Sequence, residues 1–434
     1  MNDDHANVPL LQEPNITAFD TTDTTRTTPD KPPRYVGGFS TVMNMLNTLM
    51  GAGVLGIADS FRFTGFVPSF AMMLIIAILS YVATQMVVTL QLRKHTKSFE
   101  QLTEMTLGKI GSTIYSIAAT FFCLSALVVF LIISGGTVQS WINYSSWQVP
   151  DGSWRYRFIL LGYALVLPVA LTIPKNMHFL SYFSTFSIIC LFTFVFVVII
   201  KGIQMLPSQG IHETCIIAHI NSGIFNALAI YSLTFALAAV VMPVIAPSEP
   251  RLNLRSVTVG VTFFLCFLCS SIPGVIGYLI FGTTVKPVLL ESFPPNDVLT
   301  IIVRAAFFIV VNASYPVVSL TVGSSYARAI FGVNSALELN GWRRILVLFI
   351  LNVIPVLIAM FLPNIRPALA IGGAIGGCLS NFVFPSLIWI RASGRKVTHW
   401  TNILCIFLCI FGIVSLLIST YESVLDAIHQ FSGK

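Results

Sequence analysis

Charged side chains are scarce in this sequence. Asp, Glu, Lys and Arg make up 9% of its 434 residues, whereas 55% of the residues are hydrophobic and the mean hydropathy is +0.84. A soluble globular protein of this composition would expose a largely apolar surface to water, which excludes that class. A protein that crosses a membrane many times exposes such a surface to lipid instead. The composition therefore predicts a polytopic membrane protein.

Side-chain sets that could bind a metal or carry out catalysis are also missing. Seven of the eight cysteines fall in apolar segments, where Cys266 and Cys269 form a C-x-x-C pair without a second pair of zinc ligands. The seven histidines all lie in tails, loops or at the ends of apolar runs. No His-Asp, His-Glu or Ser-His set occurs at membrane depth. The sequence predicts neither an enzyme nor a resident cofactor.

Acidic residues and lysines are absent from the middle of the apolar segments. Asp59 lies at the end of the first segment and Arg304 near the outer end of the eighth. This distribution argues against a proton relay of buried carboxylates and against a voltage sensor. The ligands of a bound ion would have to be carbonyl, hydroxyl and amide oxygens, which suit Na⁺.

Apolar runs punctuated by charge, proline and glycine predict about eleven membrane-spanning helices. The polar stretch 1–35, rich in Thr, Asp and Pro, is expected to be a disordered cytosolic tail, and 421–434 a short C-terminal tail. The helices are expected at 38–58, 66–90, 112–140, 158–174, 180–204, 222–246, 256–281, 298–325, 344–362, 367–390 and 401–420.

Basic residues indicate how the chain is oriented. The net charge of +7 comes from short loops between apolar runs, which favours the positive-inside rule over nucleic-acid binding. With a cytosolic N-terminus, 16 Lys and Arg residues lie on the cytosolic side and seven on the other. An odd number of spans then places the C-terminus on the extracellular or luminal side. The sequon at Asn143 would lie on that side, where it could be glycosylated.

The first segment contains "NTLMGAGVLGIADSF", residues 47–61, in which Gly51, Gly53 and Gly56 are close together. Such glycines either let another helix pack closely or interrupt the helix so that its backbone can bind a ligand. In lipid an unwound stretch survives only where it is buried in protein or lines a cavity. A break near residue 52 would free N–H groups that attract a carboxylate and carbonyls that coordinate a cation. The motif alone leaves both interpretations open.

Polar residues and prolines in other segments favour the interrupted helix. The sixth segment is five helices after the first, as inverted repeats require, and it carries Pro243, which removes a helical hydrogen bond. Pro316 interrupts a polar stripe in the eighth segment. The stripe consists of Asn312, Ser314, Ser319, Thr321, Ser324 and Ser325.

Two further stretches are given structural roles. "AIGGAIGGCLSN", residues 370–381, contains two overlapping G-x-x-x-G pairs, which favour close helix packing over ligand contact. "RKHTKSFEQLTEMTLGK", residues 93–109, is expected to form an amphipathic helix at the cytosolic membrane surface.

These stretches resemble the amino acid/auxin permease family, most closely its sodium-coupled neutral amino acid transporter branch. "NTLMGAGVLGIADSFRFTG" is similar to the family's first-helix signature N-x-x-x-G-x-G-I-L-G-x-P, and "LTIPKNMHFLSYFS" and "SYPVVSL" fit the same branch. The resemblance covers the chain past about residue 35. It implies a transporter domain over 36–420 with interrupted helices 1 and 6. The domain would hold two inverted five-helix repeats, about 38–204 and 222–390, and an extra helix at 401–420.

The resemblance also implies which residues bind the substrate and a cation. Three positions depart from the family pattern: Ala58 stands at the usual small-residue-or-proline position, Asp59 stands where an aromatic is common, and Ala238 lies where a Cys-His pair is often nearby. The cation site would include Asn47 and Ser314. The substrate site would include Gly51, Ala52, Gly53, Val54, Tyr231, Ser232, Phe235 and Ala236.

We therefore expect a secondary active transporter that carries neutral amino acids across a membrane by alternating access, coupled to Na⁺ or H⁺. Its expected partners are the small amino acid and the lipid bilayer, with no nucleic acid, and the plasma membrane is favoured over the lysosome or vacuole. Two other classes stay open: a membrane sensor that binds an amino acid with little flux, and an ion channel, for which no repeated filter motif is present.

Overall fold

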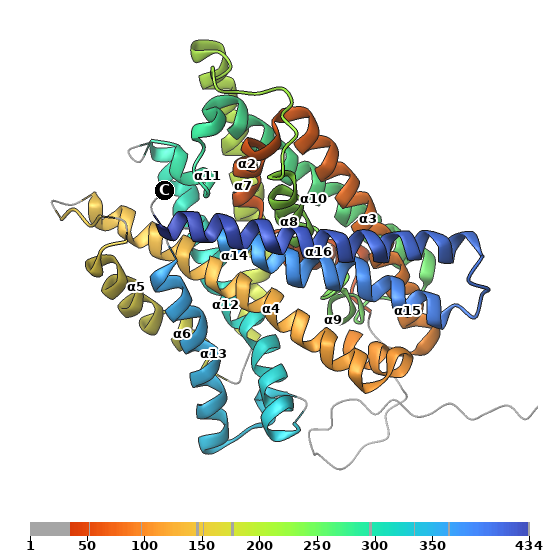
Figure 1. Ribbon diagram of the computed structural model, residues 1–434. Helices are drawn as coiled ribbons and strands as arrows, with labels where there is room; N and C mark the ends of the chain where they lie inside the picture. The colour runs from red at the N-terminus through yellow and green to blue at the C-terminus, as the bar shows by residue number, and fades with distance from the viewer. Residues whose placement is uncertain are drawn as a thin grey trace, which may run out of the picture. The chain divides into compact units, whose positions relative to one another are not determined.

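The computed structural model describes residues 35–432 except 52, 97, 145–146, 151, 175–177, 295–296, 334 and 363–364. Almost all of the described residues are helical (Figure 1). In chain order the elements are α1 (Gly38–Leu49), α2 (Gly53–Thr64), α3 (Phe66–Lys94), α4 (Phe99–Asn143), α5 (Trp154–Val166), α6 (Pro168–Leu171), α7 (His178–Gln209), α8 (Ile224–Thr234), α9 (Val241–Ile245), α10 (Leu252–Phe281), η1 (Gly282–Thr284), α11 (Leu289–Ser292), α12 (Val298–Phe331), η2 (Ala336–Glu338), α13 (Gly341–Phe361), α14 (Arg366–Ile371), η3 (Gly372–Gly377), η4 (Leu379–Val383), α15 (Phe384–Ala392) and α16 (Trp400–Ser432).

The helices confirm the predicted class of protein. Within the described ranges, nine helices are long and apolar enough to cross a membrane, and up to ten if α1 and α2 form one bent span. The sixth predicted segment, 222–246, is helical only over α8 and α9, which are too short for the same criterion. The predicted count of eleven is therefore not confirmed, although every other predicted segment coincides with a helix or a set of consecutive helices.

Local sequence explains where several helices begin and turn. Ser98, Ser153 and Asp297 each precede a helix and accept a hydrogen bond from a backbone N–H in its first turn, which satisfies one of the free donors there. Gly108 interrupts α4 with φ +77°, a conformation that glycine adopts at little cost. The residues before it form a separate helical stretch, which confirms the predicted helix within 93–109.

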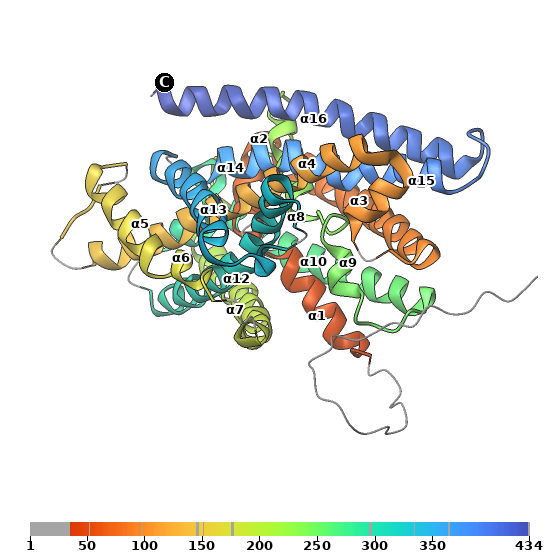
Figure 2. The same ribbon diagram turned by 90° about the horizontal axis from the view of Figure 1, so that it is seen from below.

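The centre of the structure is built around α4 and α12, which pack against each other (Figure 1). On one side, α16 packs along α14 and α15 (Figure 2). Its other face exposes large apolar side chains, as expected for a helix that contacts lipid. They include Ile403, Phe407, Ile410 and Leu417.

The glycine-rich tenth segment packs closely against its neighbours, as predicted, but part of it is π-helical and not α-helical. A Cβ on Gly373 would overlap the carbonyl oxygen of Ala229 in α8, and one on Gly376 would overlap Phe122 in α4. The prediction of close helix packing is thus confirmed. The segments η3 and η4 are π-helical, a wider geometry that occurs mostly in short stretches and often near functional sites.

Candidate functional site

The first predicted span is interrupted at its glycines. Helix α1 ends at Leu49 and α2 begins at Gly53, and the two axes are bent by 54°. Met50 and Gly51 lie in the gap, while Ala52 lies outside the described residues. The predicted interruption of helix 1 is therefore confirmed.

The start of α2 lies directly beside the end of α8. A Cβ added to Gly53 would be 2.7 Å from Oγ1 and 3.4 Å from Cα of Thr234, the last residue of α8. On the other side of the gap, a Cβ on Gly51 would lie 3.7 Å from the ring of Phe130 in α4. The first N–H groups of a helix carry partial positive charge and the last carbonyls partial negative charge. Two half-helix ends of opposite polarity thus meet at this point.

The sixth predicted span is interrupted over a longer stretch. Six residues, 235–240, separate α8 from α9. The Tyr115 hydroxyl of α4 donates to the carbonyl of Ala239 (3.1 Å), and Nδ2 of Asn381 in η4 donates to the carbonyl of Phe235 (3.5 Å). Pro243 is not the cause of this break. It lies in the first turn of α9, where its missing N–H costs no helical hydrogen bond.

The predicted substrate residues of the sixth segment are buried among neighbouring helices. Tyr231 and Phe235 are fully buried. The hydroxyl of Ser60 in α2 donates to that of Tyr231 (2.8 Å), and the Sγ of Cys378 lies 3.8 Å from Oγ of Ser232. Ala236 is also buried, as are Gly53 and Val54 across the gap. The structure thus brings the predicted substrate residues of the first segment next to those of the sixth segment. Among them, Gly51 is partly exposed.

A cavity of about 790 Å³ reaches the sixth-segment break from one side of the protein. We call it the Arg328 cavity. At its mouth, Arg328 in α12 pairs with Glu100 (3.1 Å) and Glu104 (3.4 Å) at the start of α4. The lining also includes Ser112, Tyr115, Ser116, Phe122, Cys123, Ala239, Val240, Pro243, Thr321, Ser324 and Ser325.

Sequence reasoning identified part of this lining. Thr321, Ser324 and Ser325 belong to the polar stripe of the eighth segment, so the stripe was a usable signal. Tyr115 and Cys123 were missed, because a single tyrosine or cysteine in an apolar helix has no distinctive spacing. Their role depends on which helix face α4 turns toward the cavity.

The predicted cation residues lie on α1 and α12, and both are partly buried. Asn47 is in the last turn of α1, and Ser314 precedes Pro316 in α12. Because proline has no N–H, it leaves the carbonyl of Asn312 without its helical partner. The side chain of Asn312 accepts a hydrogen bond from Tyr163. Helix α7 packs against both α1 and α12.

The middle of α2 is held in place by a buried ion pair. Asp59 is 1% exposed, and Arg366 at the start of α14 donates to its two carboxylate oxygens at 2.5 and 2.7 Å. Such two-point contacts fix geometry as well as charge. The only acidic residue of the first segment thus has a cationic partner.

A second cavity, of about 400 Å³, lies at the opposite end of α4 and α12. We call it the Arg304 cavity. Asn143, the predicted glycosylation site, is among its lining residues. The Oδ1 of Asn143 accepts a hydrogen bond from the N–H of Val149 (2.7 Å), and its Nδ2 donates one to the carbonyl of Val149 (3.3 Å).

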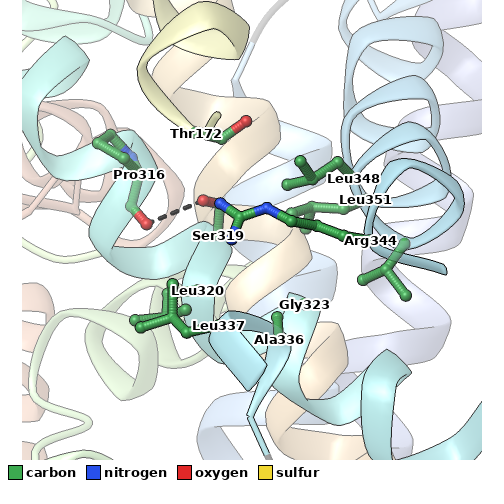
Figure 3. A pocket seen from close by; sticks show the side chains of 11 residues that line it. Thr172, Pro316, Ser319, Leu320, Gly323, Ala336, Leu337, Arg344, Leu348 and Leu351 are labelled. Atoms are coloured by element: carbon green, nitrogen blue, oxygen red, sulfur yellow. Dashed lines mark hydrogen bonds between the residues drawn. The ribbon is translucent and has the colours of Figure 1, made fainter. Parts of the chain in front are cut away.

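A much smaller cavity, of about 20 Å³, lies between α12 and α13 (Figure 3). Its lining includes Thr172, Ser319 and Arg344, but no residue of α1, α2, α8 or α9. It is therefore separate from the two breaks. In the described part of the chain, no group of three or more His, Cys, Asp or Glu side chains could hold a metal ion.

Comparison with known proteins agrees with this architecture. A zebrafish (Danio rerio) sodium-coupled neutral amino acid transporter 7 is 25% identical over 404 residues, covering 88% of this chain and 84% of the relative. A crystal structure of MhsT in complex with L-phenylalanine has a TM-score of 0.58 at 13% identity, covering 91% of this chain and 100% of the other. A manganese transporter from Eremococcus coleocola, solved with an aromatic bis-isothiourea compound, has a TM-score of 0.57 at 13% identity, covering 89% and 86%.

These similarities confirm the predicted fold class: an all-helical membrane transporter fold in which the first and sixth segments are interrupted. The repeat boundaries at 38–204 and 222–390 stay predictions. The sequence model of a family described as transmembrane amino acid transporter proteins matches residues 37–425, which is most of the chain. The chain therefore belongs to the transmembrane amino acid transporter protein family.

Proposed function

We propose that this protein is a secondary active transporter that moves neutral amino acids by alternating access, driven by Na⁺. The observation that carries the proposal is the meeting of the α2 N-terminus with the α8 C-terminus at Gly53 and Thr234. An amino acid has a carboxylate and an ammonium group on the same carbon. Two helix ends of opposite polarity at one point match both charges without a charged side chain.

In the proposed mechanism, N–H groups at Gly51, Ala52, Gly53 and Val54 bind the substrate carboxylate. Carbonyls near the end of α8 and in the 235–240 break bind the ammonium group. The side chain would lie toward Phe130 and the buried residues Tyr231, Ser232, Phe235 and Ala236. No acidic side chain occurs among these residues, which favours a neutral substrate over a cationic one.

The proposed cation site combines Asn47 of α1 with Ser314 of α12. Amide, hydroxyl and carbonyl oxygens are suitable ligands for Na⁺, and the carbonyl of Asn312 adds one because of Pro316. Asp59, the buried carboxylate nearest to the α1–α2 break in the sequence, is paired with Arg366. This supports Na⁺ rather than H⁺ as the coupling ion. Binding of ion and substrate would then be linked reciprocally.

The Arg328 cavity supports alternating access. It connects the sixth-segment break to one side of the protein, whereas α2 is covered by α10, α11 and α14. We propose that this is the state open to the cytosol, and that closure of this cavity accompanies opening on the other side. The predicted orientation would place Arg328 in the cytosol and Asn143 outside, at the plasma membrane.

Uptake into proteoliposomes tests the proposal. Radiolabelled neutral amino acids are offered under a Na⁺ gradient or a pH gradient imposed separately. We expect accumulation with the Na⁺ gradient alone. Asn47→Ala should raise the Na⁺ concentration for half-maximal uptake at least about tenfold. Asn44→Ala, an exposed asparagine on the same helix, is the matched control. Binding without accumulation under either gradient would instead indicate a sensor.

Orientation can be tested independently. Treating the protein from animal cells with a glycosidase should shift its mobility, and Asn143→Gln should abolish the shift. A cysteine introduced by Thr321→Cys, at an exposed position of the Arg328 cavity, should be labelled by a membrane-impermeant thiol reagent from the cytosolic side, with the unsubstituted protein as the control. Labelling from outside the cell alone would contradict the proposed orientation.

A further inference from the structure

The small cavity between α12 and α13 contains a buried guanidinium nitrogen. We call it the Arg344 cavity, and Figure 3 shows the Arg344 side chain reaching from α13 toward Ser319 on α12. Nη2 of Arg344 donates to the carbonyl of Ile173 (2.6 Å). Nη1 is buried and forms no hydrogen bond within the described part of the chain. One end of the guanidinium is thus satisfied by the described residues and the other is not.

The positive charge of Arg344 is not balanced by a described carboxylate. Arg344 is partly buried, and none of the ion pairs between described residues includes it. Glu338, the acidic residue nearest to it in the sequence, is exposed. Burying a charge is costly unless the charge is paired and hydrogen-bonded. The cavity therefore favours an anion, which supplies both an acceptor for Nη1 and a negative charge.

The size of the cavity limits what this anion can be. Its volume is about 20 Å³, whereas one water molecule needs roughly 10–15 Å³. This is room for a single water or a single monatomic ion. It is too little for a phosphate, a carboxylate or an amino acid. Of the common physiological anions, chloride is the one that is monatomic.

Two hydroxyl groups in the lining can act as further donors. Oγ of Ser319 donates to the carbonyl of Pro316 (2.8 Å), and Oγ1 of Thr172 donates to that of Val169 (2.7 Å). The hydrogen of a hydroxyl group rotates to suit its partners. The carbonyl of Val169 also accepts from the N–H of Thr172 (3.0 Å), so it keeps a donor when the hydroxyl turns away. An anion beside Nη1 thus has one charged and two neutral donors around it.

We propose that the Arg344 cavity is a chloride site. The ion accepts hydrogen bonds from Nη1 of Arg344 and from the hydroxyl groups of Ser319 and Thr172. It thereby links α13 and Thr172, the residue that follows α6, to α12. Helix α12 also carries Ser314 of the proposed cation site. The chloride site goes beyond the proposed transport function and does not depend on it, because binding of the ion can be measured without flux.

The thermal stability of the purified full-length protein in detergent tests this site. The melting temperature is measured in potassium chloride, potassium bromide and potassium gluconate at constant ionic strength. We expect chloride to raise it saturably by about 1–3 °C relative to gluconate, because an ion that binds only the folded state stabilises that state. Bromide, which is also monatomic, should act similarly. Arg344→Gln should abolish the shift. Arg343→Gln, which changes the adjacent exposed arginine, is the matched control and should keep it.

Ser319→Ala tests the site even if Arg344→Gln reduces folding. It removes one donor, so we expect the chloride concentration for the half-maximal shift to rise about tenfold, as for a lost hydrogen bond to an ion. Equal melting temperatures of the wild-type protein in chloride and gluconate would mean that the cavity holds only water, and the proposal would be wrong. A shift that persists unchanged in Arg344→Gln or in Ser319→Ala would place the chloride elsewhere and would also overturn it.

Discussion

The two interrupted segments differ in how their breaks are built. In the first segment, α1 ends at Leu49 and α2 begins at Gly53, and the sequence has glycines at positions 51 and 53. The sixth is non-helical over six residues, 235–240, without any glycine. Its carbonyls at Phe235 and Ala239 accept hydrogen bonds from side chains of two other helices instead.

This difference shows two solutions to one physical problem. In a membrane, every backbone group that leaves a helix needs another partner. At the first break, small residues allow the backbone to turn sharply and to approach Thr234 and Phe130. At the sixth break, neighbouring helices provide donors. The first break should therefore be sensitive to added side-chain volume, and the sixth to the loss of a donor.

The largest effect is expected from Gly53→Val. The new Cβ would lie 2.7 Å from Oγ1 and 3.4 Å from Cα of Thr234, so α2 and α8 must separate. We expect uptake to fall at least about 100-fold at normal membrane levels, because an error of about 1 Å in positioning has effects of this size. Combining it with Thr234→Ala should restore part of the activity. Wild-type uptake by Gly53→Val would show that the contact is not needed.

The second-largest effect is expected from Asp59→Asn, because this substitution removes the negative partner of Arg366 and loosens α2. Breaking a buried ion pair by removing one partner costs about 3–5 kcal/mol, so we expect a clear fall in melting temperature in detergent. The melting temperature of the double variant Asp59→Asn with Arg366→Gln should fall less than that of the single variant, because the charge of Arg366 is also removed and Arg62, the other cation near Asp59, is 35% exposed to solvent. An equal or greater fall in melting temperature in the double variant would contradict an effect that is specific to this ion pair.

Gly373→Ala tests the packing that holds α8 in place. Its methyl group would overlap the carbonyl oxygen of Ala229, and overpacking costs about 1–3 kcal/mol. We expect lower thermal stability. Gly162→Ala in α5 is the matched control, because nothing lies within 4 Å of its added Cβ and alanine favours a helix by about 1 kcal/mol over glycine. Similar stability changes in both variants would argue against specific packing at Gly373.

The smallest effect is expected from Tyr115→Phe, which removes only the donor to Ala239. A hydrogen bond contributes about 0.5–1.5 kcal/mol, so uptake should change no more than about tenfold. Amide hydrogen exchange over 235–240 should become faster, while exchange over 53–64 should not. Tyr81→Phe, which contacts Phe263, is the control. Unchanged exchange at the sixth break would show that Tyr115 does not stabilise it.

The structure confirms the class of helical membrane protein, which was predicted from composition, and two features that were predicted from small residues. Gly51 and Gly53 marked the first break because few other residues permit it, and the glycines at 372–377 marked a close contact. The sixth break was expected because of Pro243, but it occurs earlier, where no residue in the sequence marks it. Its position depends on Tyr115 and Asn381, which are more than 100 residues away along the chain.

The sequence by itself determined that this protein is a bundle of apolar helices, and it favoured a break at Gly51–Gly53. Burial in lipid and the freedom of glycine act locally, so they can be inferred from composition and short motifs. Only the tertiary structure decided which helix ends meet, where the sixth segment unwinds and which charges line each cavity. Those features depend on side chains that are distant in the chain. The backbone N–H and C=O groups that these side chains stabilise are chemically the same in every residue, so the sequence does not mark them.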